Sequence, residues 1–424
     1  MRRVLIVTSA YSPSMTADMH RARHLAWELP SLGWQVEILC PDASYQAPHS
    51  RDADSSGFFA PGILVHEVPA RFSWLARILG LGGIGWRAAL PMYLAGRRLL
   101  RSKHYDLVYF STTQGPLFAL GPLWRHYGGV PFILDIQDPL YKEGSATPVW
   151  SKPSPKHTIV HKLAKRIESF AVPRAAALVA VSAAYIEALL ERYERRNPDW
   201  KDSRRQAVIP FPVSLRDLKE AARGEPSSRA IAYVGAGGPI MARSFGLLCQ
   251  CLAQLRIAEP ALIQGVRIDL RGTMTGWQPG DPKHLHDIAV THGVGDLVDE
   301  DPRRVSFRES IELLQGGDGA LVLGIDNAGY MPSKLFGYAG SGKPLLAVVR
   351  HESPPFRQLE ADPTLGHVIG FDEKGQPTPN AMSEVAAFLR EVKDRRKFER
   401  EAALREFDTA TMAARHAALF EACL

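Results

Sequence analysis

Cysteine and long apolar runs are both scarce in this sequence, and each scarcity excludes a class of protein. Only four of the 424 residues are cysteines. Cys249 and Cys251 are too close together for the usual zinc-ligand spacing, and the four fit no disulfide framework, so we expect packing residues in a reducing compartment. No segment approaches the roughly 20 apolar residues of a membrane-spanning helix. The apolar run after Met1 is too short for a signal sequence. A cytoplasmic protein is therefore predicted.

Several catalytic patterns are absent as well. The sequence has no P-loop, and its glycine-rich segment lacks the spacing of a dinucleotide fingerprint. We find no Ser/His/Asp or Cys/His arrangement for nucleophilic catalysis and no metal-ligand cluster. His284 and His286 are adjacent on a polar helix, which favours solvated side chains over metal ligands. Neither a metal nor a resident cofactor is expected.

Acidic residues are missing from residues 71–103, in a chain whose formal net charge is +6. The basic residues of this segment are Arg71, Arg77, Arg87, Arg97, Arg98, Arg101 and Lys103. Aromatic and aliphatic side chains lie between them. Two interpretations have equal weight: a peripheral contact with the anionic inner face of the cell membrane, or a surface helix pair with its apolar face in the core. No recognition motif accompanies the charge, so a nucleic-acid partner is not expected.

Apolar strands alternate with helical segments twice along the chain. In the first half we expect strands at 4–8, 36–40, 64–68, 107–110, 132–136, 178–181 and 207–209, and helices at 19–32, 116–127, 157–174 and 183–194. In the second half we expect strands at 230–234, 266–270, 303–307, 319–324, 344–349 and 367–370, and helices at 244–257, 282–292, 309–315, 379–394 and 403–420. Such alternation predicts parallel, doubly wound sheets.

The length sets the number of domains, because single cores rarely exceed about 250–300 residues. The fold class is therefore α/β, with two Rossmann-like domains whose parallel sheets face each other across a cleft. We expect the first domain at 1–209 and the second at 230–400. The segment 210–229 is rich in Pro, Arg and Glu and is interpreted as a linker, and a last helix occupies 401–424.

Two motifs of the second half indicate an anion site. Gly235, Gly237 and Gly238 follow a strand, where a phosphate can approach the backbone. In the second motif Ser333 suits an N-cap. Lys334 in the first turn opposes the helix dipole, which is unfavourable for the helix unless an anion binds there. The alternative is a short connecting helix with a solvated lysine. A diphosphate between the two motifs is the economical interpretation. The remaining candidates for this site are Arg243, Gly272, Asp326 and Asn327.

The first half offers a second set of candidates where its strands end. Asp138 precedes Pro139 after the strand 132–136 and is the catalytic candidate, with an Asp-Pro turn as the alternative. Asp135 is interpreted as a turn anchor. Ser14 and Arg21 are candidates for acceptor binding; of Arg21, Arg23 and His24 we expect one to contact a ligand and the others to lie on the surface.

These motifs together resemble the GT-B glycosyltransferases, specifically those of glycosyltransferase family four. The resemblance rests on the segments 4–8, 21–34, 134–139, 234–238 and 332–344. It implies that a nucleoside-diphosphate-sugar is bound in the second domain by Gly235, Arg243, Ser333 and Lys334. It also implies that Asp138 is an acid facing the acceptor, that transfer retains anomeric configuration without a required metal, and that the final helix often crosses back to the first domain. A glycan or lipid-linked acceptor in surface polysaccharide assembly is expected.

The sequence departs from that family at three positions. Ala236 stands where the family commonly has an arginine, and Gly329 and Gly337 stand where it has two glutamates, the second of which holds the ribose. Either Asp326 or another residue compensates, or donor binding is altered or lost. Two alternatives stay open. One is a sugar-nucleotide epimerase on the same fold, for which we find no convincing set of carboxylates and histidines. The other is a non-catalytic protein with a degenerate donor site, which the missing glutamates favour.

Overall fold

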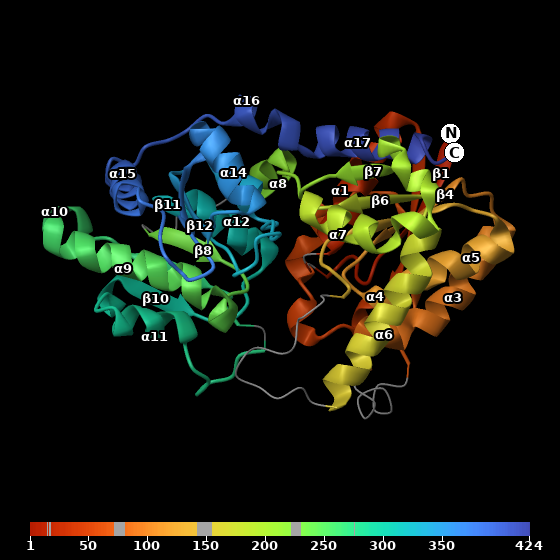
Figure 1. The fold of residues 1–424 in the computed structure, drawn as a ribbon, viewed down its shortest axis with the longest axis horizontal. Helices are drawn as coiled ribbons and strands as arrows, with labels where there is room; N and C mark the ends of the chain where they lie inside the picture. The colour runs from red at the N-terminus through yellow and green to blue at the C-terminus, as the bar shows by residue number, and fades with distance from the viewer. Residues whose placement is uncertain (15, 17, 72–80, 142–154, 222–229, 275) are drawn as a thin grey trace. The chain divides into compact units, whose positions relative to one another are not determined.

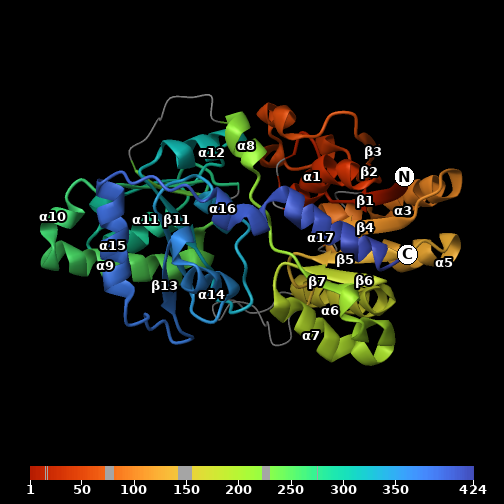
Figure 2. The same ribbon diagram turned by 90° about the horizontal axis from the view of Figure 1, so that it is seen from above.

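A computed structural model describes residues 1–424 apart from 15, 17, 72–80, 142–154, 222–229 and 275. The chain divides into two units. The first contains Met1–Pro210 together with Thr409–Leu424, and the second contains Phe211–Asp408. The last helix, α17 (Thr409–Glu421), thus packs within the first unit, beside α1 (Met19–Glu28) and β7 (Gln206–Val208) (Figures 1 and 2).

The first unit is built on a seven-stranded parallel sheet with the order β3-β2-β1-β4-β5-β6-β7. The other strands are β1 (Arg2–Val7), β2 (Trp34–Pro41), β3 (Leu64–Val68), β4 (Leu107–Ser111), β5 (Phe132–Ile136) and β6 (Ala177–Ala180). The other helices are α3 (Ile84–Ser102), α4 (Gly115–Phe118), α5 (Leu120–Gly128), α6 (Pro155–Ala171) and α7 (Ala183–Tyr193). Every residue of β4 and β5 is buried, as expected for central strands covered on both faces.

The second unit has a six-stranded parallel sheet with the order β10-β9-β8-β11-β12-β13. Its strands are β8 (Ile231–Val234), β9 (Ile268–Arg271), β10 (Val298–Asp301), β11 (Gly319–Leu323), β12 (Leu345–Arg350) and β13 (His367–Phe371). Its helices are α8 (Leu215–Ala221), α9 (Ala242–Ala258), α10 (Pro260–Ile263), α11 (His284–Thr291), α12 (Phe307–Gly316), α13 (Leu335–Ala339), α14 (Pro354–Ala361), α15 (Ala381–Lys393) and α16 (Glu401–Leu404). The predicted class, two parallel doubly wound sheets, is confirmed.

The strand predicted at 303–307 is wrong, because the strand lies at Val298–Asp301 and Phe307 begins α12. Ser306 caps that helix by accepting a hydrogen bond from the backbone N–H of Glu309 at 3.1 Å. The true strand, β10, escaped prediction because it is an edge strand with the sequence Val-Asp-Glu-Asp and little apolar character.

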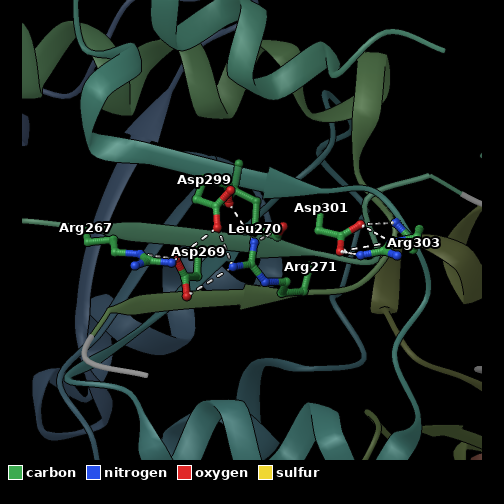
Figure 3. A network of polar contacts seen from close by, with 7 residues as sticks. All are labelled: Arg267, Asp269, Leu270, Arg271, Asp299, Asp301 and Arg303. Carbon is green, nitrogen blue, oxygen red and sulfur yellow. Dashed lines mark hydrogen bonds and ion pairs between the residues drawn. The ribbon is translucent and has the colours of Figure 1, made fainter. Parts of the chain in front are cut away.

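Arginines neutralise the outer acids of this edge strand (Figure 3). Asp299 lies 2.7 Å from Arg271 and 3.3 Å from Arg267, and Asp301 pairs with Arg303 at 2.5 Å. A row of charges on an edge strand disfavours pairing with another chain.

Part of the segment interpreted as a linker is a helix of the second unit. α8 occupies Leu215–Ala221 and buries Leu218 and Ala221. Arg308 donates to the carbonyl oxygen of Glu220 at 2.8 Å and ties this helix to α12. Residues 210–214 precede this helix, and residues 222–229 lie outside the described residues. The prediction failed because charged residues on the outer face of a short helix resemble linker composition.

Candidate functional site

The glycine loop and Lys334 meet at the carboxyl end of β8. The Lys334 Nζ donates to the carbonyl oxygen of Val234 and lies 5.5 Å from the ring centroid of Tyr233. A Cβ placed on Gly235 would lie 1.2 Å from that Nζ, and the φ of Gly235 is +135°. Only glycine therefore leaves room for the ammonium. The structure brings together two motifs that are far apart in the sequence.

The ammonium of Lys334 is a cation in a partly enclosed position. Burial and the nearby charge of Arg304 lower the pKa of Lys334 to about 8. The Tyr338 hydroxyl, one helical turn further along α13, donates to the same Val234 carbonyl oxygen at 2.6 Å and lies 3.0 Å from the Val234 N–H. The start of α13 is thereby held against the end of β8. A cation enclosed beside exposed loop backbone is suited to an anion.

Ser333 is not the N-cap that the sequence predicted. The first hydrogen bond of α13 runs from the Tyr338 N–H to the Lys334 carbonyl oxygen at 2.8 Å, which makes Lys334 the N-cap, and no side chain caps the helix. The Ser333 side chain is half-buried just before it.

Backbone hydrogen bonds fix the other glycines of the loop. The Gly237 N–H donates to the Thr273 carbonyl oxygen at 2.9 Å, and the Gly272 N–H donates to Asp301 at 3.0 Å. Gly238 and Gly272 have φ values of +72° and +74°, in the left-handed region that favours glycine. Three chain segments thus converge where β8, β9 and β10 end.

Arg243 and Asp326, both candidates for donor binding, form an ion pair with each other. The Arg243 Nη1 lies 2.6 Å from Asp326 Oδ2 and 2.8 Å from the carbonyl oxygen of Glu373. The other carboxylate oxygen of Asp326 accepts from Arg350 at 2.7 Å. Both side chains are about two-fifths exposed, at 42% and 39%. A bound anion or a ribose hydroxyl would have to compete with this pair.

One of the two positions that lack the family's glutamates has room for a side chain. A Cβ on Gly337 would meet no atom within 4 Å, so a side chain fits there. Asn327, beside Asp326, uses its Oδ1 to accept the Gly329 N–H at 2.9 Å. That bond closes a local turn and leaves the Asn327 amide nitrogen for other partners.

In the first unit, the catalytic candidate Asp138 is exposed just beyond β5. Ser14, a candidate for acceptor binding, is fully buried instead, and its hydroxyl donates to the Ser50 carbonyl oxygen at 3.0 Å. Its assignment is not supported, because the hydroxyl is already used inside the fold.

Arg21 is likewise an internal residue and not an exposed acceptor contact. Its side chain is 2% exposed and its Nε lies 2.8 Å from Asp135, whose side chain is fully buried. Arg21 also donates to the Ile209 carbonyl oxygen at 2.7 Å. Arg23 and His24, of which at least one was expected on the surface, are buried too. Asp135 is therefore the partner of a buried cation and more than a turn anchor.

His416 joins this network from α17. Its Nδ1 donates to the Met412 carbonyl oxygen at 2.7 Å, which leaves Nε2 to accept from the Tyr109 hydroxyl at 3.1 Å. Burial and the charge of Arg21 lower the pKa of His416 well below its ordinary value, so the ring is neutral. The network fastens the last helix to the sheet of the first unit.

Sequence reasoning missed the residues that support the site. Tyr338 follows Lys334 by four residues on one helix face, a spacing that could have identified it. Tyr233 and Thr273 carried no such signal.

Comparison with known proteins finds a family model that matches part of this chain. Residues 20–200 match the family model described as "Glycosyl transferase 4-like domain". A search of curated proteins finds no match.

Solved structures of similar fold span nearly the whole chain. Anabaena Alr3699/HepE in complex with UDP-glucose shares 14% identity at a TM-score of 0.56, over 98% of each chain. A UDP-forming α,α-trehalose-phosphate synthase from Burkholderia xenovorans shares 11% at 0.59, over 99% of each chain. The UDP-GlcNAc 2-epimerase from Methanocaldococcus jannaschii shares 11% at 0.52, over 98% of each chain. At such identities the likeness establishes the fold. Residues 20–200 are thus similar to a glycosyl transferase 4-like domain, and the chain as a whole shares the two-sheet GT-B fold of these solved structures.

Proposed function

We propose that this enzyme transfers a sugar, with retention of configuration, from a nucleoside-diphosphate-sugar to a glycan or lipid-linked acceptor in surface polysaccharide assembly. The observation that carries the proposal is the Lys334 ammonium held against the backbone of Gly235 at the end of β8. The UDP-glucose complex of the Anabaena protein supports this class of donor. No resident cofactor is required by this scheme, because the donor is a co-substrate.

The chemistry needs a group that stabilises the departing diphosphate. Lys334 supplies a positive charge that is held at the end of β8 before the reaction begins. Arg243 adds a second cation when it leaves Asp326, and the freed carboxylate is then available to a ribose hydroxyl. Asp138, exposed beyond β5, faces the acceptor in this scheme.

Calorimetry on the full chain tests the donor site with a panel of nucleoside diphosphates. Lys334→Ala should abolish measurable binding, whereas Lys393→Ala should not change it. Lys393 is a matched control because its Nζ also donates to a backbone carbonyl, that of Ala261, at the contact of α15 with α10. If the parent protein binds no nucleoside diphosphate at millimolar concentration, the donor site is absent and the non-catalytic alternative replaces the proposal.

The epimerase alternative is favoured only by the likeness to the Methanocaldococcus fold. Product analysis separates the two. A transferase releases nucleoside diphosphate only when an acceptor is present, whereas an epimerase converts one nucleotide-sugar into another without any acceptor.

We further propose that the first unit meets its acceptor at an anionic membrane surface. On α3, the side chains of Leu90 and Leu94 are 61% and 51% exposed, and Arg98 and Arg101 continue the same helix face. The opposite face is buried through Ala88, Met92 and Gly96, among others.

Other basic residues of the segment serve the fold. Arg97 lies over the Tyr127 ring at 5.2 Å, and Arg87 donates to the Ala70 carbonyl oxygen at 3.3 Å. Residues 72–80, which include Arg77, lie outside the described residues. Among the described helices, none combines the length and apolar character needed to cross a bilayer.

Liposome sedimentation tests this surface. Binding should require anionic lipid and weaken as salt increases. The double variant Arg98→Glu/Arg101→Glu should lose it, and Arg204→Glu, an exposed change elsewhere in the first unit, should keep it. Equal binding by the double variant would refute the membrane contact.

A further inference from the structure

One buried carboxylate stands directly behind the glycine loop and belongs to no candidate set. Glu300, in the middle of β10, is 2% exposed. Its neighbours Asp299 and Asp301 face the arginines of the sheet edge. Because side chains alternate along a strand, Glu300 points to the opposite side, into the unit.

The Glu300 carboxylate is held by hydrogen-bond donors of two other segments. Its Oε2 accepts the backbone N–H groups of Leu285 and His286, at 3.0 and 2.8 Å, in the first turn of α11. Its Oε1 accepts the hydroxyl of Thr273, which is 3% exposed. A carboxylate suits the positive end of a helix dipole and satisfies N–H groups that have no partner within the helix.

Both Thr273 and the first turn of α11 contact the glycine loop. The Thr273 carbonyl oxygen accepts the Gly237 N–H at 2.9 Å. A Cβ on Gly237 would lie 3.3 Å from the Leu285 side chain and 3.4 Å from the Thr273 Cβ. One carboxylate therefore fixes the two groups that the loop touches.

We propose that Glu300 is a positioning residue that holds the loop Gly235–Gly238 in the conformation presented to the donor diphosphate. The inference rests on the proposed function for the identity of the ligand, but the effect on the loop does not depend on it. A glutamine would keep the shape and turn an NH2 group toward a donor. An apolar residue would leave two helix N–H groups and a hydroxyl without this acceptor.

The test uses the full chain in four forms: the parent, Glu300→Gln, Thr273→Val and the double variant. Thr273→Val removes the hydroxyl but keeps the carbonyl oxygen that accepts from Gly237. Glu384→Gln is the control, because Glu384 is a carboxylate of the same unit that contacts His367 on another face. Hydrogen exchange of residues 235–238 is measured without ligand, and the Kd for UDP is measured by calorimetry.

Each single variant should speed exchange of the loop and raise the Kd about tenfold, the scale of one lost hydrogen bond to a charged group. The double variant should be no worse than the worse single one, because both changes break the same link. Glu384→Gln should change neither the exchange rate of the loop nor the Kd for UDP. Restoring the carboxylate as Glu300→Asp should recover part of the affinity.

Unchanged loop exchange in Thr273→Val and Glu300→Gln would overturn the inference, even if the parent binds UDP tightly. Faster exchange in a protein that binds no nucleotide would instead support the positioning of the loop and count against the proposed function. If Glu300→Gln does not fold, Thr273→Val decides the question alone.

Discussion

The Lys334 ammonium occupies the space that a Cβ on Gly235 would need, at a distance of 1.2 Å. Each residue therefore restricts the other. The glycine is required by the lysine, and the lysine reaches the Val234 carbonyl oxygen only because the glycine has no side chain. A side chain at Gly235 would therefore displace the Lys334 ammonium from the end of β8.

Gly235→Ala should weaken nucleoside-diphosphate binding at least about tenfold, because the methyl group displaces Lys334 and φ at this position is +135°. Calorimetry gives the affinity, and urea unfolding shows whether the variant is folded. Gly265→Ala is the matched control: its φ is +78°, but a Cβ there meets no atom within 4 Å. Equal binding by parent and Gly235→Ala would contradict the close fit.

The pH dependence of the reaction should report the Lys334 ammonium. Burial lowers its pKa from 10.5 to about 8, so kcat/KM should fall as pH rises above about 8. Lys334→Arg should flatten this decline, because a guanidinium stays charged throughout the range. A pH–rate profile of both proteins makes the comparison.

The same shift has the opposite effect on folding. Between pH 8 and 10.5 the unfolded chain binds more protons at Lys334 than the folded chain does, so this group makes the ligand-free protein more stable as pH rises. Lys334→Met should lack that increment in urea unfolding. An identical pH dependence in parent and variant would argue against the lowered pKa.

Gly337→Glu should tighten nucleotide binding by about 1–2 kcal/mol, the scale of a charge-assisted hydrogen bond to the ribose. The structure has room for the change, since a Cβ at this position meets no atom within 4 Å. Calorimetry with UDP and with the free base separates a ribose contact from a base contact. Gly337→Ala controls for the loss of glycine, and a gain in that variant as well would exclude the ribose bond as the cause.

Arg21→Ala should destabilise the first unit by about 3–5 kcal/mol, because it leaves the buried Asp135 carboxylate without its cation. Urea unfolding measures the change. Arg204→Ala should have little effect, since its partner Asp202 and Arg204 itself are on the surface. A small effect of Arg21→Ala would show that the buried pair contributes little to the fold.

Short stretches of the sequence determined most of the architecture. β4 and β5 are mainly apolar runs followed by helical segments, interrupted only by Ser111 and Asp135, and such a run can be recognised without knowing its neighbours. The proximity of the glycine loop and Lys334 was also predictable. They follow β8 and β11, which are adjacent, and the carboxyl ends of parallel strands meet at one edge.

The edge strand β10 could not be predicted in the same way. Its three consecutive acids resemble a loop. They become compatible with a strand only because Asp299 is neutralised by Arg271, the last residue of β9, and by Arg267, which precedes β9. The carboxylate of the central acid, Glu300, accepts hydrogen bonds from the start of α11 and from Thr273.

The roles of the charged residues were decided by the tertiary structure alone. Arg21 is buried against Asp135, Arg243 is paired with Asp326, and Lys334 lies beside Gly235 and donates to the Val234 carbonyl oxygen. Local sequence specifies backbone conformation and the apolar face of each element. Whether a charged side chain meets solvent, a ligand or a buried partner depends on residues that the fold brings from elsewhere in the chain.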